Sequence, residues 1–197
     1  MDRREFLEAA AKYGLRAAAA LLAGGAYPLF AQGAQAAPPP TTLAAQPPRA
    51  AAGARLPDLV AVKGGEPEAL FDAGIAALGG MRAFVKAGQT VVVKPNIGWD
   101  QPPEAAANTN PRLVKRVVEH CLDAGARKVY VFDNSCDAWT LCYKSSMIER
   151  YAKEAGAEVV PANAAGYYHE VAFPGAATLR RAKVHELLVE CDVFINV

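Results

Sequence analysis

The sequence lacks the paired cysteines of a metal site. It has four cysteines in 197 residues, and no two of them have the C-x-x-C spacing of a zinc or iron–sulfur loop. The G-x-S-x-G turn, the Walker loop and the G-x-G-x-x-G loop are also absent. His185 and Glu186 form an H-E pair, but no second histidine follows at zinc-protease spacing. We therefore expect no iron–sulfur cluster within this chain, and the common hydrolase and nucleotide signatures are excluded.

A strong net charge and a long uninterrupted hydrophobic run are missing too. The formal net charge is +1, and residues 37–197 carry equal numbers of basic and acidic side chains. Binding to nucleic acid or anionic lipid depends on an excess of positive charge, so neither partner is expected. The Ala-rich stretch 17–31 contains glycine and proline and is short for a bilayer about 30 Å thick.

The N-terminus instead has the features of an export signal. Four residues match the twin-arginine motif: Arg3, Arg4, Phe6 and Leu7. Ala34-Gln35-Ala36 has the A-x-A form that signal peptidase cleaves, whereas Asp2 and Glu8 depart from the usual motif. We expect residues 1–36 to direct the chain through the twin-arginine translocase to the periplasm. The alternative is an uncleaved signal that tethers the protein to the membrane.

The remainder divides into a linker and a domain. Residues 37–57 are mostly alanine and proline and lack apolar periodicity, which predicts an extended linker. From residue 58 onward, short β-branched runs alternate with helical patterns. The predicted strands are 59–62, 90–93, 128–133 and 157–160, and the predicted helices are 67–78, 111–124 and 144–155. This order is typical of an α/β domain with a mostly parallel sheet and helices on both faces.

The end of the domain has a less regular pattern. The run 167–173 predicts an extra strand, and 185–190 predicts a short helix. The apolar run 193–197 predicts another interior strand. Domains seldom end on such a strand, which leaves two interpretations: either it closes the sheet at its edge, or the domain is incomplete at Val197.

Polar residues gather where two predicted strands end. In open parallel sheets, ligands bind beyond the carboxyl ends of the strands, and a helix start nearby favours an anion. The loop after the strand 90–93 is long and leads to the helix that begins at Pro111. The residues predicted to bind a ligand are Lys94, Asn96, Asn108, Thr109, Asn110, Asp133 and Ser135.

Three interpretations of these residues remain open. Lys94 would attract a phosphate or a carboxylate. Alternatively, Asp133 and Asp100 would hold a metal. In the third interpretation, Lys94 and Asp133 form a structural ion pair across neighbouring strand ends, and residues 108–110 only cap a helix. Caps and ion pairs are common, so spacing alone favours the third.

The cysteines differ in how well their positions suit a function. Cys121 lies on the apolar face of the helix from Pro111 and is expected to be an inert core thiol. His120, beside it, is expected to pack or to face solvent rather than to bind a ligand. Cys136 follows a strand end and has the position best suited to a function. An oxidising periplasm would permit it to pair with Cys142, although the spacing does not show such a bond.

Three stretches together resemble the domain of unknown function 362 family: VVVKPNIG at 91–98, NPRLVKRVVEHCLDAGARKVYVFDNS at 110–135 and CDVFINV at 191–197. The resemblance covers residues 59–197 and implies an α/β domain of uncertain activity. Some members carry ferredoxin-type cysteine clusters, which this chain lacks. Members usually continue past the last strand into a proline and a basic stretch, so the resemblance implies truncation at Val197.

Three functions fit these patterns. The first is an exported protein that binds a small anion or a metal around Lys94, Asn96 and Asp133, with a redox-associated enzyme as one form of it. The second is a non-catalytic periplasmic module that uses the same residues for recognition. The third is an inactive fragment of a longer protein, with an exposed apolar edge at 193–197.

Overall fold

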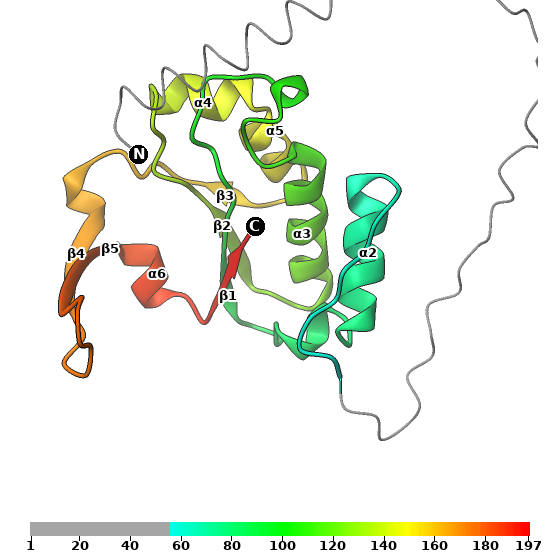
Figure 1. Cartoon of the computed structure of the whole chain (residues 1–197), viewed down its shortest axis with the longest axis horizontal. Coiled ribbons are helices and arrows are strands. Elements are labelled where there is room, and N and C mark those ends of the chain that lie inside the picture. Colours follow the sequence, from blue (N-terminus) through cyan, green and yellow to red (C-terminus); the bar gives the residue numbers. More distant parts are fainter. Residues whose placement is uncertain (1–55) are drawn as a thin grey trace, which may run out of the picture. The chain divides into compact units, whose positions relative to one another are not determined.

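The computed structural model describes residues 56–197. The predicted signal peptide, residues 1–36, lies outside the described residues, as does nearly all of the predicted linker, 37–57. The described part of the chain has an α/β fold (Figure 1). None of its helices is long and apolar enough to cross a membrane.

Four parallel strands form the central sheet. In spatial order they are β3 (Glu158–Val159), β2 (Lys128–Val131), β1 (Thr90–Lys94) and β6 (Val193–Asn196). Residues Val91 to Val93 of β1 have no exposed surface, because an interior parallel strand is covered on both faces. The predicted α/β class with a parallel sheet is therefore confirmed, together with the strands predicted at 90–93, 128–133 and 157–160.

The prediction of a strand at 59–62 is wrong. These residues belong to no sheet, and Leu59 is 81% exposed. Val60 and Val62 instead line a groove along helix α2 (Pro67–Ala77). Val62 lies next to Gly74 of this helix, since a Cβ at that position would be in ordinary van der Waals contact with Val62 Cγ2, at 3.6 Å. A short apolar run does not by itself distinguish a strand from a segment packed on a helix.

Helices α2, α3 (Pro111–Asp123), α4 (Trp139–Ser145) and α5 (Ile148–Glu154) lie on one face of the sheet (Figure 1). Helix α3 presents an apolar side to the strands, and its buried residues include Val114, Val117 and Cys121. It starts as predicted, since the Asn110 side chain accepts a hydrogen bond from the Arg112 N–H at 2.9 Å. It ends before Gly125, whose φ of 103° suits glycine.

The helix predicted at 144–155 is two helices. Helix α4 begins earlier, at Trp139, and α5 begins only at Ile148. Between them Met147 has a φ of 63°, which lies in the left-handed region and interrupts the helix. The Ser146 hydroxyl accepts a hydrogen bond from the Ile148 N–H at 3.3 Å at the new helix start. The break directs Cys142 and Tyr143 of α4 toward the strand ends.

The other face of the sheet has a smaller covering layer. Strands β4 (Tyr168–Ala172) and β5 (Arg181–His185) form an antiparallel pair, and helix α6 (Glu186–Glu190) follows them. Val92 points to this face because side chains alternate along a strand. It packs with Phe132 and Ala162, and Leu187 and Leu188 of α6 cover them. The predicted extra strand, the predicted short helix and the presence of helices on both faces are confirmed.

The interior strand predicted at 193–197 lies at an edge. Within the described residues β6 pairs only with β1, and Phe194 is 48% exposed. Val193 and Ile195 pack against the main core on one side. The apolar run therefore reflects one covered face rather than two.

Candidate functional site

The strand order places the candidate site at a point of reversal. The chain runs from β1 to β2 to β3 in one direction and then returns to place β6 on the other side of β1. Lys94 is the last residue of β1 and pairs in register with Asn196 of β6. Ligand sites of open α/β sheets lie beyond the carboxyl ends of the strands at such a reversal.

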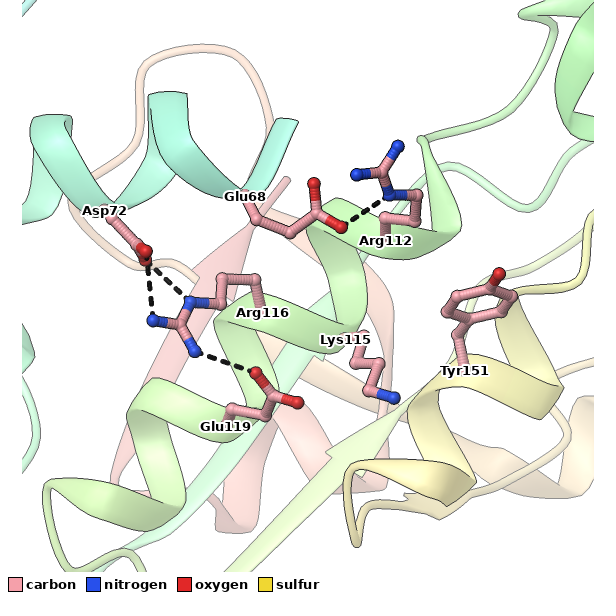
Figure 2. Close-up of a pocket in the computed structure, with 7 residues that line it drawn as sticks. All are labelled: Glu68, Asp72, Arg112, Lys115, Arg116, Glu119 and Tyr151. Carbon is pink, nitrogen blue, oxygen red and sulfur yellow. Dashed lines mark hydrogen bonds and ion pairs between the residues drawn. The ribbon is translucent and has the colours of Figure 1, made fainter. Parts of the chain in front are cut away.

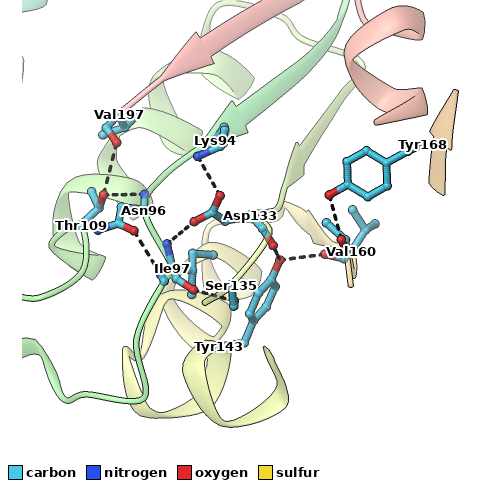
Figure 3. A network of polar contacts seen from close by, with 12 residues as sticks. Lys94, Asn96, Ile97, Thr109, Asp133, Ser135, Tyr143, Val160, Tyr168 and Val197 are labelled. Carbon is cyan, nitrogen blue, oxygen red and sulfur yellow. Dashed lines mark hydrogen bonds and ion pairs between the residues drawn. The ribbon is translucent and has the colours of Figure 1, made fainter. Parts of the chain in front are cut away.

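Lys94 and Asp133 meet across the ends of β1 and β2 (Figure 3). The Lys94 Nζ lies 2.7 Å from Asp133 Oδ1; the side chains are 35% and 8% exposed. The other carboxylate oxygen, Oδ2, accepts a hydrogen bond from the Ile97 N–H at 2.7 Å. Both oxygens of this nearly buried carboxylate therefore have a partner, whereas the Lys94 side chain is partly exposed.

A buried tyrosine holds the backbone of Asp133. The Tyr143 hydroxyl of α4 accepts a hydrogen bond from the Asp133 N–H at 2.8 Å. It lies 2.8 Å from the carbonyl oxygen of Asp133 and 3.2 Å from that of Val160, either of which accepts its proton. Burial raises the pKa of the Tyr143 phenol, so the hydroxyl stays neutral. Its neutral hydroxyl thus joins α4 to the ends of β2 and β3.

Tyr168 of β4 contributes a second hydroxyl near the strand ends. Its Oη donates to the Ala162 carbonyl oxygen at 2.8 Å. Burial raises the pKa of this phenol, and the negative charge of Asp133 adds to the effect. Residue-type patterns missed both Tyr143 and Tyr168. The only available signal was that a tyrosine in an apolar stretch needs a hydrogen-bond partner when it is buried.

The amides of the loop after β1 hold that loop together. Asn96 donates from Nδ2 to the Ala107 carbonyl oxygen at 3.0 Å and accepts at Oδ1 from the Gly98 N–H at 3.1 Å. Asn108 accepts from the Trp99 N–H and donates to the Trp99 carbonyl oxygen, each at 3.0 Å. Two residues predicted to bind a ligand thus have structural partners inside the loop.

Thr109, Asn110 and Ser135 also have partners within the protein. The Thr109 hydroxyl accepts from the Asn96 N–H at 2.9 Å and donates to the Val197 carbonyl oxygen at 3.2 Å. Ser135 Oγ donates to the Ile97 carbonyl oxygen at 2.6 Å. The Asn110 side chain caps α3, and the first residue of that helix is a proline without an N–H. The start of α3 therefore offers few donors to an anion.

The two aspartates proposed as metal ligands have separate partners. Asp100 accepts hydrogen bonds from the Ser145 hydroxyl at Oδ1, and its own N–H donates to Asp137 Oδ2 at 3.2 Å. Asp133 is held by Lys94 and Ile97. Among residues 56–197, no group of three or more His, Cys, Asp or Glu side chains is arranged to hold a metal ion.

A charged pocket between α2, α3 and α5 lies elsewhere (Figure 2). It has a volume of about 280 Å³ and is lined by Glu68, Asp72, Arg112, Lys115, Arg116, Glu119 and Tyr151. Arg116 forms ion pairs with Asp72 at 2.7 Å and with Glu119 at 3.0 Å. The hydrogen bond from Arg116 lowers the pKa of Asp72, which also pairs with His120. The pocket has three acidic and three basic side chains, and their ion pairs link α2 to α3. We therefore assign these charges a structural role.

Comparison with known proteins gives one match. The family described as "Domain of unknown function (DUF362)" matches residues 91–197, which is more than half of the chain and includes Lys94, Asp133 and the loop between β1 and α3. No curated protein and no solved structure matches. The match starts in β1, so α2 lies before it. The chain belongs to the DUF362 family.

Proposed function

We propose that the protein binds a small anion, either a phosphate or a carboxylate, at the carboxyl ends of β1, β2 and β6. Lys94 is the observation that carries this proposal. It lies at the end of a central strand, its side chain is 35% exposed, and Asp133 is its one charged partner within the described residues. A lysine ammonium has three N–H donors, so donors remain for an anion that approaches from the exposed side.

The arrangement of Asp133 supports an anion more than a metal. A metal would have to displace Lys94 from Oδ1 and the Ile97 N–H from Oδ2, since each of these donors lies 2.7 Å from its oxygen. An anion requires no such exchange. Asp133 instead fixes the position of the ammonium group. The Asp133 side chain is itself only 8% exposed, so its negative charge is largely shielded from an approaching anion.

Export is a further part of the proposal. We propose that the twin-arginine translocase carries the protein to the periplasm, on the support of Arg3, Arg4 and the A-x-A site that ends at Ala36. That route moves folded and often cofactor-loaded proteins, which would suit a redox-associated role. Changing both arginines to lysine is expected to leave the precursor in the cytoplasm. Normal release of processed protein from the double variant would contradict the export proposal.

Titration calorimetry with inorganic phosphate, succinate and citrate tests the binding proposal. Lys94→Gln is expected to lower the affinity for the tightest-binding of these anions about tenfold or more, because a hydrogen bond to a charged group contributes about 1.5–3 kcal/mol. Lys128→Gln is the matched control, since Lys128 also forms a strand-end ion pair, with Glu158, but at the amino end of β2. Equal affinities for both variants, or no binding by the unmodified protein, would overturn the proposal.

A further inference from the structure

Two cysteines lie against the same glycine beside the strand ends. The Cys142 thiol donates to the Gly98 carbonyl oxygen, with 3.6 Å from sulfur to oxygen. The N–H groups of Cys136 and Asp137 donate to that same oxygen at 2.9 and 3.1 Å. The Cys142 sulfur and the backbone of Cys136 therefore meet at one atom, although six positions separate them in the sequence.

The Cys136 sulfur lies beside Gly98 as well. A Cβ at Gly98 would lie 3.8 Å from the Cys136 sulfur and only 3.0 Å from Asn96 Oδ1. The Cys142 sulfur thus lies against the short segment that carries Cys136.

The two thiols differ in exposure. Cys136 is exposed, whereas Cys142 is buried, and burial raises the pKa of the Cys142 thiol. An exposed thiol is the one that a dissolved disulfide reaches first. A buried neighbour needs no access to solvent, since it reacts within the protein. This difference in exposure would suit Cys136 as the attacking thiol and Cys142 as the resolving thiol.

The remaining cysteines have no such neighbour. Cys121 is fully buried on α3, and burial raises its pKa to about 12. Cys191 follows α6 and packs with the small core on the other face of the sheet. Neither contacts Gly98 in the described structure, so both provide controls.

We propose that Cys136 and Cys142 form a disulfide by thiol–disulfide exchange, independently of any anion at Lys94. The Cys136 thiolate attacks a small disulfide such as oxidised glutathione, forms a mixed disulfide and releases one glutathione thiolate. The Cys142 thiolate then attacks the Cys136 sulfur, forms the internal disulfide and releases the second glutathione. The two protein thiols lose two electrons and two protons, and one glutathione disulfide is reduced to two thiols.

The bond would close a loop that holds the candidate site. Asp137 accepts from the Asp100 N–H and Ser135 donates to the Ile97 carbonyl oxygen, so the segment around Cys136 supports the loop after β1. Cys142 lies in α4 next to Tyr143, which holds Asp133. Oxidation would therefore join the segment that supports this loop to the helix that holds Asp133.

Peptide mapping of the full chain provides the test. The reduced, folded protein is incubated with oxidised glutathione at pH 8, then denatured, alkylated and digested with trypsin. Cleavage after Lys128 and Lys144 leaves both cysteines in one peptide, 129–144. We expect this peptide to carry no alkyl group and to be lighter than its reduced form by two hydrogens. A further cut between Trp139 and Cys142 should give two pieces that separate only after reduction.

Single variants distinguish the two steps. Cys142→Ser should leave a lasting glutathione adduct on Cys136, and Cys136→Ser should leave Cys142 free and alkylated. Cys121→Ser and Cys191→Ser should form the same internal bond as the unmodified protein. The proposal is overturned by a lasting adduct on Cys136 in the unmodified protein, by a bond to Cys191, or by a 136–142 bond that forms only in urea.

Discussion

The two ends of the sheet carry the same pair of charges in different surroundings. At the carboxyl end, Lys94 of β1 pairs with Asp133 at 2.7 Å, and the aspartate side chain is 8% exposed. At the amino end, Lys128 of β2 pairs with Glu158 of β3 at 2.6 Å, and these side chains are 43% and 51% exposed. Similar distances therefore join lysine to a nearly buried acid in one pair and to an exposed acid in the other.

The difference lies in what else holds each acid. The Asp133 side chain also accepts a hydrogen bond from the Ile97 N–H, and the Asp133 N–H donates to the Tyr143 hydroxyl. Surface ion pairs add little because water and salt screen them, whereas a buried charge depends on every partner it has. We infer that the carboxyl-end pair fixes the position of the two strand ends and that the exposed amino-end pair contributes little to stability.

The largest expected effect comes from removing the buried acid. Asp133→Ala leaves Lys94 without its partner and the Ile97 N–H without an acceptor. We expect the free energy of unfolding in urea to fall by about 3 kcal/mol. The matched change Glu158→Ala should leave the urea midpoint unchanged. Similar losses from the two changes would remove the distinction between the ends.

The pairing of Lys94 with Asp133 shows how far the sequence predicts this site. Apolar runs placed both residues after neighbouring strands, and parallel strands bring such residues to one edge. A structural ion pair was one of the interpretations that this placement left open. The contact at 2.7 Å is what that interpretation expected, but an ion pair is compatible with a ligand beside it. Ligand binding by these residues stays a prediction.

The tyrosine beneath Asp133 provides the next test. Tyr143→Phe removes the acceptor of the buried Asp133 N–H while it keeps the aromatic ring. An unsatisfied buried N–H should lower the free energy of unfolding by about 2 kcal/mol. At the amino end, Asp192→Ala removes the side-chain acceptor of the exposed Thr90 N–H. Water replaces that acceptor, so thermal unfolding should change much less than in Tyr143→Phe.

Contacts between distant segments explain what the sequence did not predict. Tyr143 reaches the Val160 carbonyl oxygen as well as Asp133, and neither contact follows from helical periodicity. The break at Met147, with its φ of 63°, has no glycine or proline to signal it in the sequence. Residues 59–62 pack beside α2 in a way that a short apolar run does not reveal. Helix α3, by contrast, has its cap, period and glycine stop within the sequence.

A smaller effect is expected from neutralising the carboxyl-end lysine. Lys94→Gln removes the positive charge beside Asp133. The glutamine amide keeps an N–H that can donate to the carboxylate. We expect a loss of about 1 kcal/mol in urea unfolding. Lys94→Arg keeps the charge and should recover most of it. If Lys128→Gln destabilises the protein as much as Lys94→Gln, burial of the acid is not what separates the two pairs.

Salt provides the finest comparison of the ends. The Debye length falls from about 10 Å at 0.1 M to about 3 Å at 1 M salt, and exposed pairs are screened far more than buried ones. A double-mutant cycle over Lys94 and Asp133 should therefore give a coupling energy that changes by only a few tenths of a kcal/mol between these conditions. The cycle over Lys128 and Glu158 should lose whatever coupling it shows at low salt. A carboxyl-end coupling that also vanishes at 1 M salt would mean that water reaches Asp133 more freely than its 8% exposure indicates.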